Sequence, residues 1–279
     1  MHARIKYVLA VLLLTGTILT GWVFTAQADG TGNPRLRFMH ALAGMPYVDV
    51  YVDGVKQITG LAYGGYTNFF TLTPGPHTIE FRKSGASEVV GTQGADYTTG
   101  QDYTIFIYGR EGQGDGRRIK RFDNRMNAPA VDTAAFRFVH LANNASGGTP
   151  PVKVCITQSD DCPIGDTNYQ EASGYAERAA TIYDFQYRLQ DNTVIEQDFG
   201  VRLHSGAIYS FVSIGIYNST PPLQIITLID NGQAPTDPPI SGAFLTPTML
   251  VFLLVLALLG AGIILFSWRL ISRRRATLV

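Results

Sequence analysis

The stretch Arg37-Phe38-Met39-His40 recurs one hundred positions later as Arg137-Phe138-Val139-His140. Alternate residues of a β-strand point to the same face of a sheet, so the Phe and the His of each stretch are expected to face inward together. Two units of the chain therefore start with the same strand, which predicts a tandem repeat.

Four further pairs of similar segments follow in the same order in the two units. They are Val48-Asp49-Val50 with Val152-Lys153-Val154, Gly65-Tyr66 with Gly174-Tyr175, Gly100-Gln101-Asp102-Tyr103 with Gly206-Ala207-Ile208-Tyr209, and Asp123-Asn124 with Asp230-Asn231. The offset between paired segments drifts from 100 to between 104 and 109. Such drift is expected when insertions lie in loops between retained strands, and it predicts repeats at 29–130 and 131–231.

Short segments of alternating polarity fill both repeats, without a long helical period. Strands are expected at 36–40, 47–53, 55–58, 66–73, 77–82, 100–109 and 117–122, and then at 136–142, 152–157, 179–185, 186–190, 193–199, 208–216 and 223–229. The pairs Asp53-Gly54 and Pro74-Gly75 are typical of tight turns between strands. Short strands at intervals of about 8 to 12 residues indicate β-sandwiches. The predicted fold class is all-β, with two tandem Ig-like, Greek-key sandwich modules.

The two ends of the chain indicate export and a membrane anchor. Residues 1–28 carry two basic residues, an apolar run and the small-x-small sequence Ala26-Gln27-Ala28, which predict a signal peptide. An uncleaved signal anchor is the alternative. Residues 247–268 are uncharged and long enough to cross a bilayer as one helix. The arginines of 269–279 predict a cytoplasmic tail, and the prolines of 232–246 predict a stiff stalk.

These segments predict a single-pass cell-membrane protein with its N-terminus outside, its C-terminus in the cytoplasm and both repeats outside the cytoplasm. The lipid bilayer is then one partner. Six of the 22 lysines and arginines lie in the two terminal segments, whereas all 22 acidic residues lie between them, so the exported part has a net charge of −6. Nucleic-acid binding requires a basic surface, so nucleic acid is not expected as a partner.

Cys155 and Cys162 are the only cysteines, and six residues separate them. In an exported chain such a pair predicts a disulfide. The alternation of Cys155 with Val152 and Val154 places it away from the core, at the surface. A metal-binding or redox-active pair is the alternative. The short loop limits the expected stabilisation to about 2 to 3 kcal/mol.

His40, His140, Tyr103 and Tyr209 occupy matching positions in the two repeats, and structural roles are predicted for all four. A histidine on the core face of a strand is most often hydrogen-bonded within the protein. A metal-ligand role for His40, with Asp49, Asp53 and His77, is the alternative; Lys153 and Gln186 stand near the matching positions of the second repeat. Each Gly-x-x-Tyr sequence resembles a tyrosine corner, in which the phenol bonds a nearby backbone group; exposed aromatic contact is the alternative.

Arg117, Arg118, Lys120 and Arg121 form the main basic run of the exported part. An edge strand protected by its charges against sheet-to-sheet pairing explains the run. Contact with an anionic ligand, such as an envelope polymer or lipid headgroups, is the alternative.

The described motifs resemble the bacterial extracytoplasmic modules called domain of unknown function 4397. The first repeat carries the resemblance at Arg37 to His40, Val48 to Gly54, Tyr63 to Tyr66, Pro74-Gly75 and Gly100 to Gly109, and the second at Arg137 to His140, Gly174-Tyr175 and Gly206 to Gly215. The second repeat departs from the pattern at Lys153 and Cys155 and lacks the Pro-Gly turn. The resemblance implies a β-sandwich outside the cytoplasm, and it implies no activity.

No nucleophile, zinc-protease or phosphate-loop motif is present in the sequence. We therefore predict a protein that is not an enzyme and has no cofactor or bound metal. Its modules are expected to serve structural, adhesive or ligand-binding roles, with an envelope polymer, a glycan or a protein as partner. The alternatives are an envelope hydrolase that uses carboxylates or a metal, and a polyanion-binding protein.

Overall fold

The computed structural model describes residues 32–112, 116–144 and 150–231. Every regular element in these residues is a β-strand, so the predicted all-β class is confirmed. No helix within the described ranges is long and apolar enough to cross a membrane. The predicted signal peptide 1–28, stalk 232–246, transmembrane helix 247–268 and cytoplasmic tail 269–279 lie outside the described residues.

The first repeat forms two four-stranded sheets, an outer sheet of order β3-β2-β5-β6 and an inner sheet of order β4-β1-β7-β8. The strands are β1 Arg35–Ala43, β2 Tyr47–Val52, β3 Val55–Ala62, β4 Phe70–Thr71, β5 Gly75–Lys83, β6 Val89–Tyr97, β7 Asp102–Arg110 and β8 Arg117–Asp123. β1 and β7 run parallel in the centre of the inner sheet, and the other neighbours in both sheets are antiparallel. Alternate residues such as Phe38 and Val50 fill the core between the two sheets.

The second repeat has the same plan, with an outer sheet of order β12-β11-β14-β15 and an inner sheet of order β13-β9-β16-β18. The strands are β9 Thr133–His140, β10 Asn143–Asn144, β11 Val152–Ile156, β12 Ile164–Thr167, β13 Ala176–Ala179, β14 Ile182–Leu189, β15 Val194–Arg202, β16 Ile208–Ile214, β17 Ile216–Tyr217 and β18 Gln224–Ile229. β9 and β16 again form a parallel pair. Phe138, Val154 and Phe211 belong to the core between its sheets.

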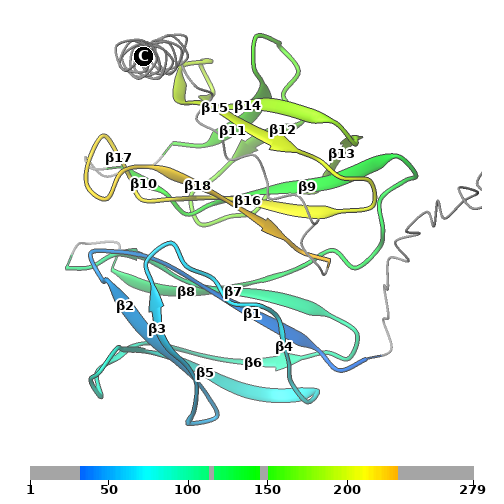
Figure 1. Cartoon of the computed structure of the whole chain (residues 1–279). Helices are drawn as coiled ribbons and strands as arrows, with labels where there is room; N and C mark the ends of the chain where they lie inside the picture. The colour runs from blue at the N-terminus through cyan, green and yellow to red at the C-terminus, as the bar shows by residue number, and fades with distance from the viewer. Residues whose placement is uncertain (1–31, 113–115, 145–149, 232–279) are drawn as a thin grey trace, which may run out of the picture.

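The two inner sheets face each other, so that the four sheets lie in series (Figure 1). A third cluster of buried apolar residues lies between the inner sheets and takes its members from both repeats. Met39 and Phe106 come from the first repeat, and Val139 and Val212 from the second. One face of each inner sheet therefore packs on its own outer sheet, and the opposite face packs on the other repeat.

Four strand predictions were wrong. β6 and β12 form where the sequence predicts no strand, because their polar and small residues are held by pairing with β5 and β11. The predicted break between Phe185 and Gln186 does not exist, because β14 pairs continuously with β11 across this point. Of the strand expected at 66–73, only β4 and an isolated bridge at Tyr66 form.

Backbone contacts correct two of the predicted equivalences between the repeats. The amide of Gly64 bonds the carbonyl of His40, and the amide of Gln170 bonds that of His140 in the same way, so Gly64 and Gln170 are equivalent. Likewise Asn124 bonds the Asp102 carbonyl, and Asp230 bonds the Ile208 carbonyl. These contacts and the two tyrosines give a constant offset of 106 from residue 64 onward. Asn124 therefore matches Asp230, not Asn231, and Tyr66 matches Ala172, not Tyr175.

Candidate functional site

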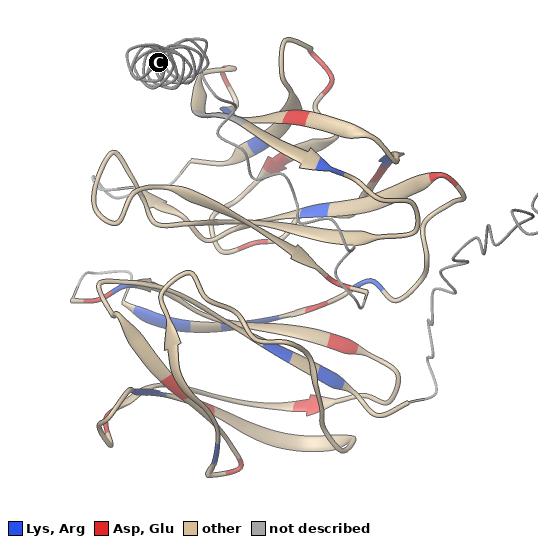
Figure 2. Cartoon of the chain, viewed as in Figure 1, with Lys and Arg blue, Asp and Glu red and all other residues tan. Residues whose placement is uncertain are grey.

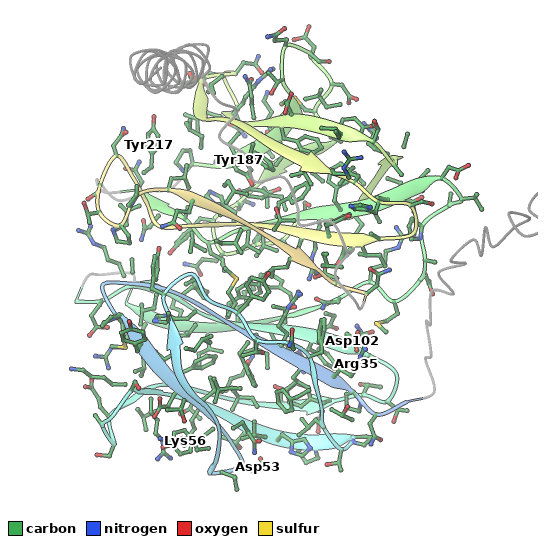
Figure 3. All side chains as sticks on the ribbon, viewed as in Figure 1. Arg35, Asp53, Lys56, Asp102, Tyr187 and Tyr217 are labelled. Carbon is green, nitrogen blue, oxygen red and sulfur yellow. A yellow bond between two sulfur atoms is a disulfide. The ribbon has the colours of Figure 1, made fainter. Side chains whose placement is uncertain are left out.

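A pocket of about 80 Å³ lies in the second repeat, at the end where β10 and β17 pair. Phe138, His140 and Tyr187 form its inner part, and Tyr217 and Leu223 lie among its other lining residues. Tyr187 projects into the interior of the repeat and Tyr217 lies at its edge (Figure 3). One water molecule needs about 10 to 15 Å³ by this measure, so the pocket has room for several waters or for part of a small ring.

A glycine after β16 shapes this end of the repeat. Gly215 has a φ of +94°, and a Cβ there would lie 2.1 Å from the carbonyl oxygen of Pro222. Only glycine accepts both the backbone conformation and the close approach. The bend lets Ile216 accompany β10, with the amide of Asn143 bonded to the carbonyl of Gly215 at 2.8 Å. Tyr217 is positioned beside the pocket as a result.

At two positions that line the pocket in the second repeat, the first repeat carries larger side chains. Strand register pairs His40 with Ile107 and His140 with Ser213, so Ser213 stands where the first repeat has Ile107. Ala142 stands where the first repeat has Leu42, two residues after the histidine. Leu42 and Ile107 are both fully buried in the first core. Replacing their larger side chains by Ala and Ser leaves space in the second repeat.

His140 is a neutral wall of the pocket at physiological pH. Its Nδ1 lies 3.1 Å from Ser213 Oγ, and its Nε2 lies 3.4 Å from the carbonyl oxygen of Pro150. Burial lowers the pKa of His140 from 6.5 to about 4. Because a carbonyl can only accept, Nε2 carries the proton and Nδ1 accepts from the serine hydroxyl. Among the described residues that line the pocket, none carries a charge, so it suits a neutral ligand.

A second, more open depression of about 470 Å³ adjoins the pocket and shares Ile195, Tyr217 and Leu223 with it. Its other lining residues are Asn218, Ser219, Thr220 and Pro222. The site thus combines an apolar pocket, an aromatic ring and a rim of amide and hydroxyl groups. Such a combination binds molecules that have an apolar face and several hydroxyl groups.

His40 has the same tautomer as His140 and is buried in the core of the first repeat. Its Nε2 donates to the carbonyl of Met45 at 2.9 Å, and its Nδ1 accepts from the amide of Leu42 at 3.3 Å. Burial lowers its pKa to about 4 as well. Both ring nitrogens are therefore used within the first repeat, as a structural role requires, and that role stays a prediction for both histidines.

The structure does not bring the proposed metal ligands of the first repeat together. Asp49 accepts from Lys56 Nζ at 2.6 Å and from the amide of Gly60 at 2.8 Å. His77 instead contacts Asp53 at 2.5 Å. Across residues 32–231, with the two internal gaps noted above, no three His, Cys, Asp or Glu side chains are placed to hold a metal ion.

Cys155 and Cys162 form the predicted disulfide. The surface position predicted for Cys155 is wrong, because its side chain is fully buried. Cys155 does point away from the core cluster of its repeat, to which Val152 and Val154 belong. Alternation along the strand therefore predicts the face correctly, whereas the burial depends on neighbouring strands and loops that alternation does not describe.

The basic run forms β8, which pairs only with β7 and is an edge strand of the inner sheet. Figure 2 shows its lysine and arginine positions together with those of β1. Arg117 pairs with Glu88 at 2.7 Å and with Glu111, and Lys120 donates to the carbonyl of Gln170 in the second repeat. Arg121 donates to the carbonyl of Asp96 at 2.7 Å. Several of these cations thus contact this chain itself, and the predicted contact of Arg117, Arg118, Lys120 and Arg121 with an anionic ligand stays a prediction.

Both predicted tyrosine bonds are present. The Tyr103 hydroxyl accepts from the amide of Thr98 at 3.0 Å, and the Tyr209 hydroxyl accepts from the amide of His204 at 3.0 Å. Each phenol thus bonds a backbone amide five residues before it, as a structural role requires.

Sequence reasoning missed the pocket and the residues beside it. Tyr217 and Leu223 fall in a segment that the sequence presents only as strand ends and a turn. The one available signal is the exchange of Leu42 and Ile107 for Ala142 and Ser213, and the second exchange is visible only once the strand register is known.

Comparison with protein families matches residues 34–147 to the domain of unknown function DUF4397. The matched range covers the first repeat and continues into β9 and β10 of the second. The predicted resemblance to this family is confirmed. A comparison with curated proteins finds no match.

Solved structures of low similarity include two carbohydrate-binding modules and one putative cell adhesion protein. A family 26 carbohydrate-binding module from Eubacterium rectale Amy13K, solved with maltoheptaose, is 11% identical, covers 73% of this chain and 98% of its own, and has a TM-score of 0.23. A streptococcal family 41 module described as recognising α-glucan is 14% identical, with 68% and 96% coverage and a TM-score of 0.22. A Bacteroides ovatus cell adhesion protein is 13% identical, with 74% and 99% coverage and a TM-score of 0.21. These values are too low to transfer a ligand to this chain.

Proposed function

We propose that this chain, whose residues 34–147 match the domain of unknown function DUF4397, is a non-catalytic binding protein held at the outside of a cell membrane. Two tandem sandwich modules are exposed to the exterior, and residues 247–268 anchor them as a single helix with a cytoplasmic tail. The second module binds a neutral ligand in its pocket, and the first serves as its support.

One observation carries this proposal: a pocket lies in the second repeat at a place where the first repeat has two large buried side chains. Two similar folds differ where Leu42 and Ile107 are replaced by Ala142 and Ser213. An unfilled apolar cavity lowers stability by an amount that grows with its volume. The pocket adjoins an aromatic and polar depression, so binding of a ligand there would offset the cost of leaving it unfilled.

The ligand class that best fits is a neutral sugar ring at the end of a glycan or envelope polymer. A sugar has an apolar face of C–H groups and a rim of hydroxyl groups. Tyr217 can cover such a face, while Asn218, Ser219 and Thr220 supply donors and acceptors for the hydroxyl groups.

The test is binding of the full-length protein, in detergent micelles, to an array of glycans and envelope polysaccharides, followed by titration calorimetry with the strongest ligand. In one variant, Ala142→Leu with Ser213→Ile gives the second repeat the side chains of the first. This variant should keep its fold and bind at least about ten-fold more weakly, because the pocket is filled.

A matched pair of tyrosine variants tests the site from the surface. Tyr217→Ala should weaken binding by about ten-fold, whereas Tyr47→Ala should not change it, because Tyr47 is exposed in the first repeat. Equal affinity in the wild type and in the filled variant would show that the ligand binds elsewhere and would refute the proposal.

A further inference from the structure

Two equivalent arginines, Arg37 and Arg137, lie buried between the inner sheets and contact the opposite repeat. Arg37 donates to the carbonyl of Ile229 at 2.8 Å and to Asp230 Oδ1 at 2.6 Å. Arg137 donates to the carbonyl of Asp123 at 2.8 Å and to Asn124 Oδ1 at 2.7 Å. In each case Nη1 binds the carbonyl and Nη2 binds the side chain of the next residue.

The acceptors of the two arginines are equivalent as well. With the offset of 106, Asp123 matches Ile229 and Asn124 matches Asp230. Each acceptor side chain also bonds a hydroxyl of its own repeat, Asn124 with Thr104 Oγ1 at 3.2 Å and Asp230 with Ser210 Oγ at 2.6 Å. Contacts in which residue i of one unit meets residue j of the other, and the reverse, define an isologous interface, as in a two-fold symmetric dimer.

One further pair of contacts between the repeats obeys the same rule. Tyr108 Oη lies 3.4 Å from Gln170 Oε1, and the reciprocal positions are Ile214 and Gly64. These are also adjacent, because a Cβ on Gly64 would lie 3.6 Å from Ile214 Cδ1. In one pair a tyrosine meets a glutamine, and in the reciprocal pair an isoleucine meets a glycine.

The apolar side chains of the interface differ in size between the two repeats. Five equivalent pairs have both members in this cluster; first repeat before second, they are Met39 and Val139, Ala41 and Leu141, Phe106 and Val212, Tyr108 and Ile214, and Phe122 and Leu228. At four of the five positions the first repeat carries the larger side chain. Pairing two first repeats would crowd rings against rings, and pairing two second repeats would leave voids.

We propose that this face is a specific docking surface by which each repeat recognises the other, with a two-fold arrangement of polar contacts and with size complementarity that favours the unlike pair. The polar contacts alone do not distinguish partners, because each repeat offers both the arginine and its acceptors. The apolar residues supply the distinction. The two repeats should therefore remain associated without the covalent connection between β8 and β9.

The test uses the full-length chain in detergent with a protease recognition sequence inserted beside Val131, whose side chain is 87% exposed. After cleavage, an affinity tag on one half is used to recover the other at nanomolar concentration. A swapped variant exchanges these large and small side chains between the two repeats. It carries Phe106→Val, Tyr108→Ile, Val212→Phe and Ile214→Tyr. Two one-sided variants carry only the first pair of changes or only the second pair.

The cut wild type and the cut swapped variant are expected to stay associated, whereas each one-sided variant should lose association by at least about ten-fold in dissociation constant. Circular dichroism of the uncut chains verifies that all four are folded. Separation of the cut wild type would refute docking. Retention in both one-sided variants, equal to the wild type, would refute size complementarity. Both results are independent of ligand binding in the pocket.

Discussion

His40 and His140 make the stability of this protein depend on pH in a defined direction. Burial lowers the pKa of both to about 4 in the folded state, whereas an unfolded histidine has a pKa of about 6.5. Between these values the unfolded state binds protons that the folded state does not. The contribution of each buried histidine to the free energy of unfolding is therefore fully present above pH 6.5, and it is lost as the pH falls towards 4.

We expect the free energy of unfolding to be lower at pH 5 than at pH 7.5 by about 2 kcal/mol for each buried histidine. His140→Gln should be less stable at pH 7.5, because its bond to Ser213 is altered, but its decrease towards pH 5 should be smaller by that amount. Urea unfolding at the two pH values measures both effects. A variant that retained the whole decrease would contradict this assignment.

The phenols of Tyr103 and Tyr209 each satisfy one backbone amide. Removing the hydroxyl leaves the amide of Thr98 or His204 without this acceptor, so Tyr103→Phe and Tyr209→Phe should each lower the free energy of unfolding by about 1 to 2 kcal/mol. Tyr47→Phe is the control, because Tyr47 is exposed and should change stability by less than about 0.5 kcal/mol. Urea denaturation compares the three, and equal values for all of them would argue against the structural role.

At the scale of elements, two glycines with positive φ allow two costs of substitution to be measured apart. One is the cost of the backbone conformation, and the other is the cost of a close contact. Gly54 has a φ of +76° and nothing within 4 Å of an added Cβ, whereas Gly215 has a φ of +94° and a clash with Pro222. Gly54→Ala should cost about 1 kcal/mol from conformation alone. Gly215→Ala should cost more than about 2 kcal/mol, because the backbone near Pro222 must also move.

Thermal unfolding of the two glycine variants measures this difference. Gly215→Ala should also weaken ligand binding, since the bend at Gly215 positions Tyr217 beside the pocket, while Gly54→Ala should bind as the wild type does. Equal loss of stability in the two variants would mean that the segment around Pro222 adapts without strain.

At the scale of the whole molecule, two buried arginines share one buried carboxylate. Arg37 Nη2 lies 2.6 Å from Asp230 and Arg137 Nη2 lies 3.9 Å from it, while Asn124 occupies the equivalent acceptor position. Asp230→Asn would leave both arginines without a carboxylate in a region where each is about 3% exposed. The free energy of unfolding should fall by about 3 to 5 kcal/mol.

The reciprocal change, Asn124→Asp, should raise the free energy of unfolding by about 1 kcal/mol, because a charge-assisted bond to Arg137 replaces a neutral acceptor. Urea denaturation at neutral pH compares the two variants. If Asp230→Asn destabilised the protein no more than a surface substitution does, the ion pairs between the repeats would not contribute to its stability.

The sequence by itself determined the all-β class, the recurrence of the arginine and histidine stretch, the disulfide and the two tyrosine bonds. Each depends on strand alternation, on matching patterns or on residues close in the chain. Only the tertiary structure decided that the repeats match at a constant offset of 106 from residue 64 onward, that Arg37 reaches Asp230, and that the second repeat has a pocket beside His140. These features depend on strand register and on contacts between residues up to 193 positions apart, which alternation along one strand does not encode.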